Sequence, residues 1–245
     1  MKTQAHVIAA RSAGGTTRLT RLSGGGPLTL RPTGSGRQAR VHLVAGVFGP
    51  LGGDELTLRV TVEAGAQLEV AAAAATLVLP SRSGQASSMR ILIDVAEAAR
   101  LTLAAPPTVV CAGASHCIDV DAVVAGDGEL VLREETVRGR TGEAGGDVTL
   151  RSRVDVCGIP VLRQNFDLRG AVGGAWAPRA VGSLLSVGPE QKPPTMGVFE
   201  ETTVRAAWLA LPQEAGYQLT ALGDDALALS QLLDGERRQL PRYVV

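Results

Sequence analysis

Residues 56–70 have the sequence LTLRVTVEAGAQLEV, in which apolar and polar side chains alternate on both sides of a short break that contains a glycine. Alternation with a period of two places every second side chain on one face of an extended strand. In the first half of the segment this face consists of Leu56, Leu58, Val60 and Val62. The five residues between Val62 and Leu68 are small or polar, which suits a tight turn. The segment therefore predicts two half-buried strands joined as a β-hairpin.

The same strand–turn–strand unit recurs three times downstream, at intervals of about thirty residues. In each copy five residues again separate two inward apolar positions, which are Val95 and Leu101, Val124 and Leu130, and Val156 and Leu162. In the strand before the last turn, Ser152 interrupts the apolar face. Because a single hairpin is unstable alone, the repeated units are expected to stack and bury one another's apolar faces. We therefore predict an all-β fold of stacked or helically wound β-hairpins, either β-helix-like or a β-sandwich.

Helical signals are confined to the C-terminal part, where we expect about two α-helices. Residues 223–240 form the stronger candidate, because acidic residues stand at its start and basic residues near its end. The apolar face of this helix would consist of Leu227, Leu229, Leu232 and Leu233. Glu200–Ala210 is the weaker candidate.

The chain is expected to form one domain, residues 1–245, in three parts. Basic strands would occupy residues 1–53, and the repeated β-hairpin body residues 54–188. A Pro-rich loop and the helical part would occupy residues 189–245. The proline-rich stretch 188–196 is expected to be flexible and to separate the β body from the C-terminal part.

The overall composition excludes several classes of protein. With 24 basic and 24 acidic residues and 45% hydrophobic residues, the chain is neither disordered nor a typical nucleic-acid binder. The charge is uneven, because the first 53 residues contain seven Lys or Arg and no Asp or Glu. Strand-like stretches within these residues argue against a transit peptide. The basic segment is thus either an ordinary charged face or an electrostatic guide for an acidic partner, and both interpretations stay open.

The cysteine content and the apolar runs indicate the cellular compartment of the protein. Three cysteines fit a reducing compartment better than a disulfide framework. The longest apolar run is too short to cross a bilayer, and the N-terminus lacks the apolar region of a secretory signal. We therefore expect a cytoplasmic protein that binds neither membrane nor nucleic acid.

Common catalytic motifs are missing from the sequence. It contains no phosphate-binding G-x-x-x-x-G-K-[ST] loop and no G-x-S-x-G nucleophile turn. Glu134 and Glu135 could perform acid–base chemistry, but adjacent strand residues face opposite sides, and we expect one of them to be in solvent. These motifs therefore point to no particular catalytic chemistry.

The best candidate for metal binding is the cluster of Cys111, His116 and Cys117, because thiolate and imidazole suit nickel or zinc. The simpler interpretation is that both cysteines are small buried hydrophobic residues at strand ends. A second unusual segment is the loop of residues 48–54, FGPLGGD, which ends in Asp54. Asp54 either caps an ordinary turn or presents a carboxylate to an internal passage.

Six segments, taken in order along the chain, resemble the urease accessory protein family UreD, also called UreH. These segments are RLTRLSGGGPLTLRP (18–32), GPLGGDELTLRVTVEAGAQLEV (49–70), AAAATLVLPS (72–81), LVLREETVRGR (130–140), PRAVGSLLSVG (178–188) and LTALGDDALALSQLL (219–233). The chain resembles a divergent member, because residues 105–116 lack the Gln and Glu of the family's Pro-Gln-Glu stretch.

The resemblance implies a non-catalytic chaperone for urease maturation. Members of this family bind apo-urease subunits and recruit UreF and UreG, a GTPase that delivers nickel. The resemblance further implies a β-helix-like array with two helices and an interior passage for transient Ni²⁺, without a tightly bound cofactor. The positions that match polar passage residues are Asp54, Thr76, Ser81 and Glu134. The residues that contact partners are not indicated by any motif.

Two other functions remain as alternatives. One is a non-catalytic β-solenoid module that binds a ligand such as a cell-surface glycan, which the low aromatic content of 3% disfavours. The other is a β-helix enzyme that uses pairs of carboxylates. We disfavour it because short turns predict antiparallel pairing, whereas a β-helix has parallel strands.

Overall fold

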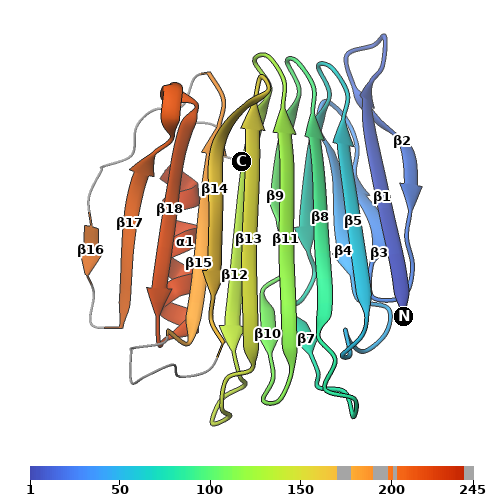
Figure 1. Cartoon of the computed structure of the whole chain (residues 1–245). Helices are drawn as coiled ribbons and strands as arrows, with labels where there is room; N and C mark the ends of the chain where they lie inside the picture. The colour runs from blue at the N-terminus through green and yellow to red at the C-terminus, as the bar shows by residue number, and fades with distance from the viewer. Residues whose placement is uncertain (170–177, 190–197, 201–202, 240–245) are drawn as a thin grey trace.

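The computed structural model describes residues 1–169, 178–189, 198–200 and 203–239. In these residues the chain forms two β-sheets that enclose a common core, together with one α-helix near the C-terminal end (Figure 1). The predicted all-β class is confirmed, and the body is a β-solenoid.

The first sheet has seven strands in the described residues. In spatial order they are β14 (Ile159–Asp167), β13 (Asp147–Val156), β11 (Ser115–Val124), β8 (Ser87–Val95), β5 (Glu55–Val62), β1 (Lys2–Arg11) and β2 (Thr17–Ser23). The strands β1, β5, β8, β11 and β13 are parallel to one another, whereas β2 and β14 are antiparallel edge strands.

The second sheet has eleven strands, nine of them in one continuous row. In spatial order these are β16 (Val198–Glu200), β17 (Val204–Ala210), β18 (Gly216–Gly223), β15 (Ala180–Val187), β12 (Glu129–Arg138), β9 (Arg100–Ala104), β6 (Gln67–Ala72), β4 (Ala39–Val44) and β3 (Thr29–Gly34). The short strands β7 (Thr76–Val78) and β10 (Thr108–Val110) form a side row that joins the far end of β12.

The sequence repeat corresponds to the coils of the solenoid. Along the first sheet, Val62 pairs with Val95, Val95 with Val124, and Val124 with Val156. The residues that follow each of the first three turns are in register in the second sheet, where Leu101 lies between Leu68 and Leu130. Equivalent positions of successive repeats therefore stack directly on one another, as the thirty-residue period predicts.

The predicted hairpins, however, are wrong for the first three units. Val62 and Leu68 lie in different sheets, and the five-residue connection between them crosses from one sheet to the other. Each strand pairs in parallel with the next coil, because the long return through the side row supplies the crossover that parallel pairing needs. Only the fourth unit, β13 with β14, is an antiparallel hairpin as predicted.

The main core lies between the two sheets and is formed by the predicted inward positions. Leu58, Val60 and Val62 of β5 are at most 1% exposed, and they face inward residues of the second sheet such as Leu68. The TRLTRL and PLTLRP stretches are strands β2 and β3, which confirms that the basic segment is folded. The stacked apolar rows thus explain why the repeat, and not any single hairpin, is the stable unit.

The helix α1 (Ala226–Gln239) packs on the outer face of β15 and β18 (Figure 1). Asp225 caps its start, since its Oδ1 accepts hydrogen bonds from the backbone N–H groups of Leu227 and Ala228 at 2.8 and 3.1 Å. Gly182 of β15 makes the close approach possible, because a Cβ there would lie 2.8 Å or less from Leu229 and Leu233. The predicted helix is confirmed.

The second predicted helix, Glu200–Ala210, is wrong. Within it, Val204–Ala210 form strand β17, whose buried residues Val204, Ala206 and Trp208 follow a period of two. The segment is a strand and not a helix because pairing with β18 satisfies its backbone hydrogen bonds. Its apolar face is covered by α1. A short 3₁₀ turn, η1 (Pro212–Glu214), connects the two strands. Residues 190–197, most of the proline-rich loop, lie outside the described residues.

The arginines divide into two groups along the solenoid. In the body many pair with acidic residues one coil away, such as Arg40 with Glu69 and Arg100 with Glu129. Five exposed arginines near the N-terminal end take part in none of the ion pairs among the described residues: Arg11, Arg18, Arg21, Arg31 and Arg37. They follow the β1–β2 and β3–β4 edge hairpins, so this end of the solenoid is basic, although Lys2 and Arg40 of the same acid-free segment pair with Glu55 and Glu69. Within the described residues, no helix combines the length and the apolar character needed to span a bilayer.

Candidate functional site

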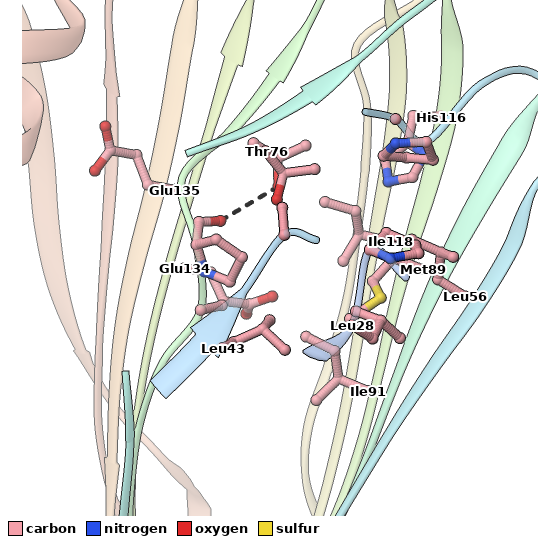
Figure 2. Close-up of a pocket in the computed structure, with 17 residues that line it drawn as sticks. Leu28, Leu43, Leu56, Thr76, Met89, Ile91, His116, Ile118, Glu134 and Glu135 are labelled. Carbon is pink, nitrogen blue, oxygen red and sulfur yellow. Dashed lines mark hydrogen bonds between the residues drawn. The ribbon is translucent and has the colours of Figure 1, made fainter. Parts of the chain in front are cut away.

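A small cavity lies between the two sheets, near the ends at which the parallel strands of the first sheet begin. Its walls are mainly apolar and include Leu28, Leu43, Leu56, Met89, Ile91 and Ile118 (Figure 2). The polar residues that line it are Thr76, Thr108, His116, Glu134 and Glu135, although the carboxylate of Glu135 points away from the cavity. The cavity measures about 40 Å³, room for a few water molecules or an ion but not for an organic substrate. We call this space the central cavity.

Glu134 is the acidic side chain that reaches into the central cavity. Strand β12 directs Leu130, Leu132 and Glu134 toward the interior because their positions alternate with residues that face α1. Burial raises the pKa of Glu134 to about 7, although a hydrogen bond from the Ser183 hydroxyl, 3.4 Å away, works in the opposite direction. The carboxyl group is therefore poised between its two protonation states near neutral pH.

Glu134 also borders a second, adjacent space, which lies between β12, β13, β14 and β15. The polar side chains of this second cavity are Thr136, Ser152, Gln164 and Ser183. Strand register aligns them, because Ser152 pairs with Gln164 in the first sheet and Glu134 with Ser183 in the second. The Gln164 Oε1 also accepts a hydrogen bond from Gln218 Nε2 at 2.8 Å. Ser152, which interrupts the apolar alternation, thus belongs to a polar interior row that the sequence analysis did not recognise.

The imidazole of His116 enters the central cavity from β11, in the first sheet, across from Glu134 in the second (Figure 2). It is 3% exposed, and its Nδ1 lies 2.8 Å from the Ser87 hydroxyl. Burial lowers the pKa of His116 to about 4, although a hydrogen bond to the backbone of Ser87 counteracts part of this effect. The ring is therefore neutral at physiological pH, and one nitrogen keeps its lone pair.

Threonines occupy equivalent positions in the side row and in the adjoining end of β12. Thr76, Thr108 and Thr136 are aligned in register across β7, β10 and β12. Thr108 donates a hydrogen bond to the Pro106 carbonyl at 3.3 Å, which Figure 2 marks with a dashed line. The predicted passage residues Thr76 and Glu134 are thus brought together in one cavity.

The other two predicted passage residues lie elsewhere. Asp54 accepts hydrogen bonds from the Met1 ammonium group at 2.6 Å and from the Leu51 backbone N–H at 2.9 Å. Burial alone would raise the pKa of Asp54, but these bonds outweigh burial and lower it. Asp54 therefore holds the loop that contributes Gly49 and Pro50 to the cavity wall, without lining the cavity itself. Ser81 lies in a neighbouring loop and shares a hydrogen bond with Ser83.

The predicted cluster of two cysteines and one histidine does not converge. His116 and Cys117 are consecutive in β11 and face opposite sides, so His116 points inward while Cys117 contacts Asp119 and Arg151 on the outer side. Burial raises the pKa of both Cys111 and Cys117, which disfavours the thiolate that metals bind. Within the described part of the chain, no three His, Cys, Asp or Glu side chains are placed to hold a metal ion.

Glu135 has a structural role that the sequence analysis missed. It faces away from Glu134, as predicted, and its carboxylate points away from the cavity (Figure 2). It is not in solvent, however, because α1 covers it and Arg133 binds it at 2.9 Å. Arg133 also donates a hydrogen bond to Ser230 of α1 at 2.9 Å and lies 3.3 Å from Asp234. This network attaches the helix to the solenoid.

These features define a class of protein, a β-solenoid with small polar cavities between its sheets. The cavities are lined by hydroxyl, amide and carboxyl groups and by the imidazole of His116, and they are too small for an organic substrate. Glu134 and Glu135 are adjacent in β12, so their side chains leave opposite faces of the strand, and Arg133 binds the carboxylate of Glu135.

Sequence comparisons identify the family. A family model described as the UreD urease accessory protein matches residues 2–242. Curated relatives named urease accessory protein UreD include one from Parafrankia sp. (strain EAN1pec), 39% identical over 90% of this chain and 82% of the relative. Another, from Streptomyces avermitilis, is 38% identical over 93% of both chains, and one from Streptomyces coelicolor is 36% identical over 96% and 95%. The chain therefore belongs to the UreD family of urease accessory proteins.

Proposed function

We propose that this chain is a non-catalytic, cytoplasmic urease maturation chaperone that binds apo-urease together with UreF and UreG and conducts Ni²⁺ through its interior. Family membership supports the urease role. The observation that carries the interior route is the position of Glu134, which borders both the central cavity and the second cavity. Hydroxyl and amide side chains line both cavities next to Glu134. A cation that leaves the central cavity would therefore meet oxygen ligands in the second cavity.

The physical chemistry of the interior suits a transient cargo. A carrier must hold a divalent cation weakly enough to release it, and single carboxylate, hydroxyl and amide oxygens bind more weakly than a cage of thiolates. The small volume of the central cavity favours an ion or water over a glycan or a substrate. The argument from antiparallel hairpins against a β-helix enzyme does not hold, because the coils are parallel. The placement of the glutamates now supports the non-catalytic role instead.

Replacing Glu134 by Gln tests the route, because the amide keeps the shape of the side chain and removes its charge. In cells that lack the native chain, Glu134→Gln should lower both urease activity and the nickel content of purified urease. The exposed Glu63→Gln variant is the control and should restore both. Size-exclusion chromatography with urease subunits, UreF and UreG should show the same complex for all three chains.

Two results would contradict the proposal. If the wild-type chain never co-elutes with urease subunits or with UreF and UreG, the chaperone role is wrong. If Glu134→Gln fills urease with nickel at the wild-type level, the interior route does not involve this carboxylate.

A further inference from the structure

The turns at the basic end of the solenoid border an open polar pocket, which we call the basic pocket. It lies between the β1–β2 turn, the β3–β4 turn and the crossing turn that follows β5. Its lining consists of Arg11, Arg37, Thr16, Gln67 and three glycines. The pocket measures about 470 Å³, which is within the range of small-molecule sites. Among these described lining residues there is no acidic, aromatic or apolar side chain.

Thr17 holds the two arginines of the basic pocket close together. It pairs with Arg11 across β1 and β2, and it forms an isolated bridge with Gly36, the residue before Arg37. Its hydroxyl donates a hydrogen bond to the Arg37 carbonyl at 2.7 Å and accepts one from the Gln67 backbone N–H at 3.0 Å. Paired strands lie about 5 Å apart, so the backbones of the two arginines are on the order of 10 Å apart. Two arginine side chains that line one pocket can close a gap of this size around a single anion.

Two glycines fix the position of the Arg11 side chain. A Cβ at Gly65 would lie 3.0 Å from Cδ and 3.2 Å from Nη1 of Arg11, and a Cβ at Gly15 would lie 3.9 Å from Nη2. The guanidinium group therefore lies against the backbone of both turns. Because its position at the pocket is set before a ligand arrives, binding costs less conformational entropy.

The positive charge of the basic pocket is not compensated as it is in the body of the solenoid. In the second sheet Gln67 pairs with Arg100, and Arg100 pairs with Glu129, to which it forms an ion pair at 2.9 Å. Gln67 occupies the equivalent position of the first coil and offers only a neutral amide. In the described part of the chain, the guanidinium groups of Arg11 and Arg37 take part in no ion pair or hydrogen bond. The pocket therefore has a charge that suits a dianion.

We propose that the basic pocket binds a small phosphate-bearing polyanion, such as pyrophosphate or the phosphate end of a nucleotide. The planar guanidinium fork matches a pair of phosphate oxygens, and a phosphate group carries nearly two negative charges at neutral pH, whereas a carboxylate carries one. The Thr16 hydroxyl and the Gln67 amide supply further hydrogen bonds. Because the described lining has no apolar or aromatic surface, the pocket recognises the phosphate groups and not a base or an alkyl chain. The site is separate from both interior cavities and does not depend on the urease role.

Titration calorimetry of the purified full chain with sodium pyrophosphate, in buffer without divalent cations, tests the site. With NaCl added to keep the ionic strength constant, pyrophosphate should bind saturably at one site per chain and raise the midpoint of thermal unfolding. Arg11→Gln and Arg37→Gln should each weaken binding by about tenfold or more. Arg18→Gln and Arg31→Gln are matched controls, because they remove the same charge from exposed positions of the same end that do not line the pocket. Both controls should bind pyrophosphate as the wild type does.

ADP and an oligoglutamate peptide distinguish the possible sources of the negative charge. Equal affinities for pyrophosphate and ADP would support the pocket as a site for free polyphosphate. Tighter binding of ADP would support it as a site for the phosphate groups of a larger ligand. If oligoglutamate displaces pyrophosphate at a lower concentration than ADP does, the pocket is a docking point for an acidic protein and the phosphate site is wrong.

Three other results would overturn the proposal. One is the absence of saturable pyrophosphate binding to the wild-type chain, in calorimetry and in the ³¹P NMR signal of the ligand. Another is an equal rise of the unfolding midpoint with NaCl alone at the same ionic strength. The third is equal weakening in the pocket variants and the matched controls, with circular dichroism showing that all four are folded, since this pattern would indicate only a general attraction to the basic end.

Discussion

At the scale of single residues, the interior of this solenoid is set by a few polar exceptions to an apolar pattern. Glu134 and His116 line the central cavity, and Ser152 lines the second cavity at an inward position where the neighbouring coil has Val120. Each of them reduces the apolar area that is buried, which costs stability that a purely structural core would retain. Because Glu134 borders both spaces, these polar side chains belong to two adjacent cavities.

The raised pKa of Glu134 predicts how stability depends on pH. The folded state has a pKa of about 7 for a group whose ordinary value is 4.5, so folding takes up a proton between these values. Stability from the neutral form is fully present below about pH 4.5 and is lost as the pH rises through 7. The free energy of unfolding should therefore fall by about 3 kcal/mol across this range in the wild type.

Urea denaturation at a series of pH values measures this dependence. Glu134→Gln should be more stable than the wild type above about pH 7, and much of the decline should disappear. The Glu63→Gln control, at an exposed position, should keep the wild-type profile. Equal pH slopes for the wild type and Glu134→Gln would show that the Glu134 carboxyl group is not desolvated.

At the scale of elements, helix α1 depends on two leucines and one glycine. Leu229 and Leu233 are fully buried against β15, where Gly182 leaves room for them. Leu227 was predicted to lie on the same apolar face, but it is 67% exposed. Positions 227 and 229 are separated by about 200° around an α-helix, so Leu227 lies on the side opposite Leu229, and the prediction that placed both on one face was wrong.

Two substitutions in the same helix test this division. Leu229→Ala should lower the free energy of unfolding by about 2–5 kcal/mol because it leaves a cavity between α1 and β15. Leu227→Ala should change it by less than about 0.5 kcal/mol. Thermal or urea unfolding followed by circular dichroism measures both, and similar losses in the two variants would contradict the packing described for α1.

At the scale of the whole molecule, charge is distributed unequally along the solenoid. The body arginines are largely neutralised by acidic residues one coil away, whereas the basic end has exposed arginines without such partners. Charged edge strands prevent uncontrolled sheet extension, which is sufficient reason for some of them. Five unpaired arginines at one end would also attract an acidic surface and accelerate its association.

Charge reversal at this end tests the attraction. If the proposed apo-urease complex is the partner of this end, Arg18→Glu/Arg21→Glu should slow association with it by about tenfold at low salt, and the difference should shrink as salt screens the charges. Arg82→Glu/Arg90→Glu, at exposed positions away from this end, changes the net charge equally and should have a smaller effect. Stopped-flow or surface-based kinetics measure the rates, and equal slowing in both variants would show that only net charge matters.

The sequence by itself determined the strands, the inward faces, the stacking period and the family, because these depend on local alternation and on segments that can be compared directly. The valines and leucines chosen from the repeat are the residues that stack in register. Only the tertiary structure decided that the short turns cross between sheets, that Val204–Ala210 is a strand, and that His116 and Glu134 border the same cavity. A five-residue turn can join two strands of one hairpin or connect strands in two different sheets. Which of the two forms depends on the neighbouring strand that satisfies the backbone hydrogen bonds of each strand. That neighbour is about thirty residues away, beyond the reach of any local pattern.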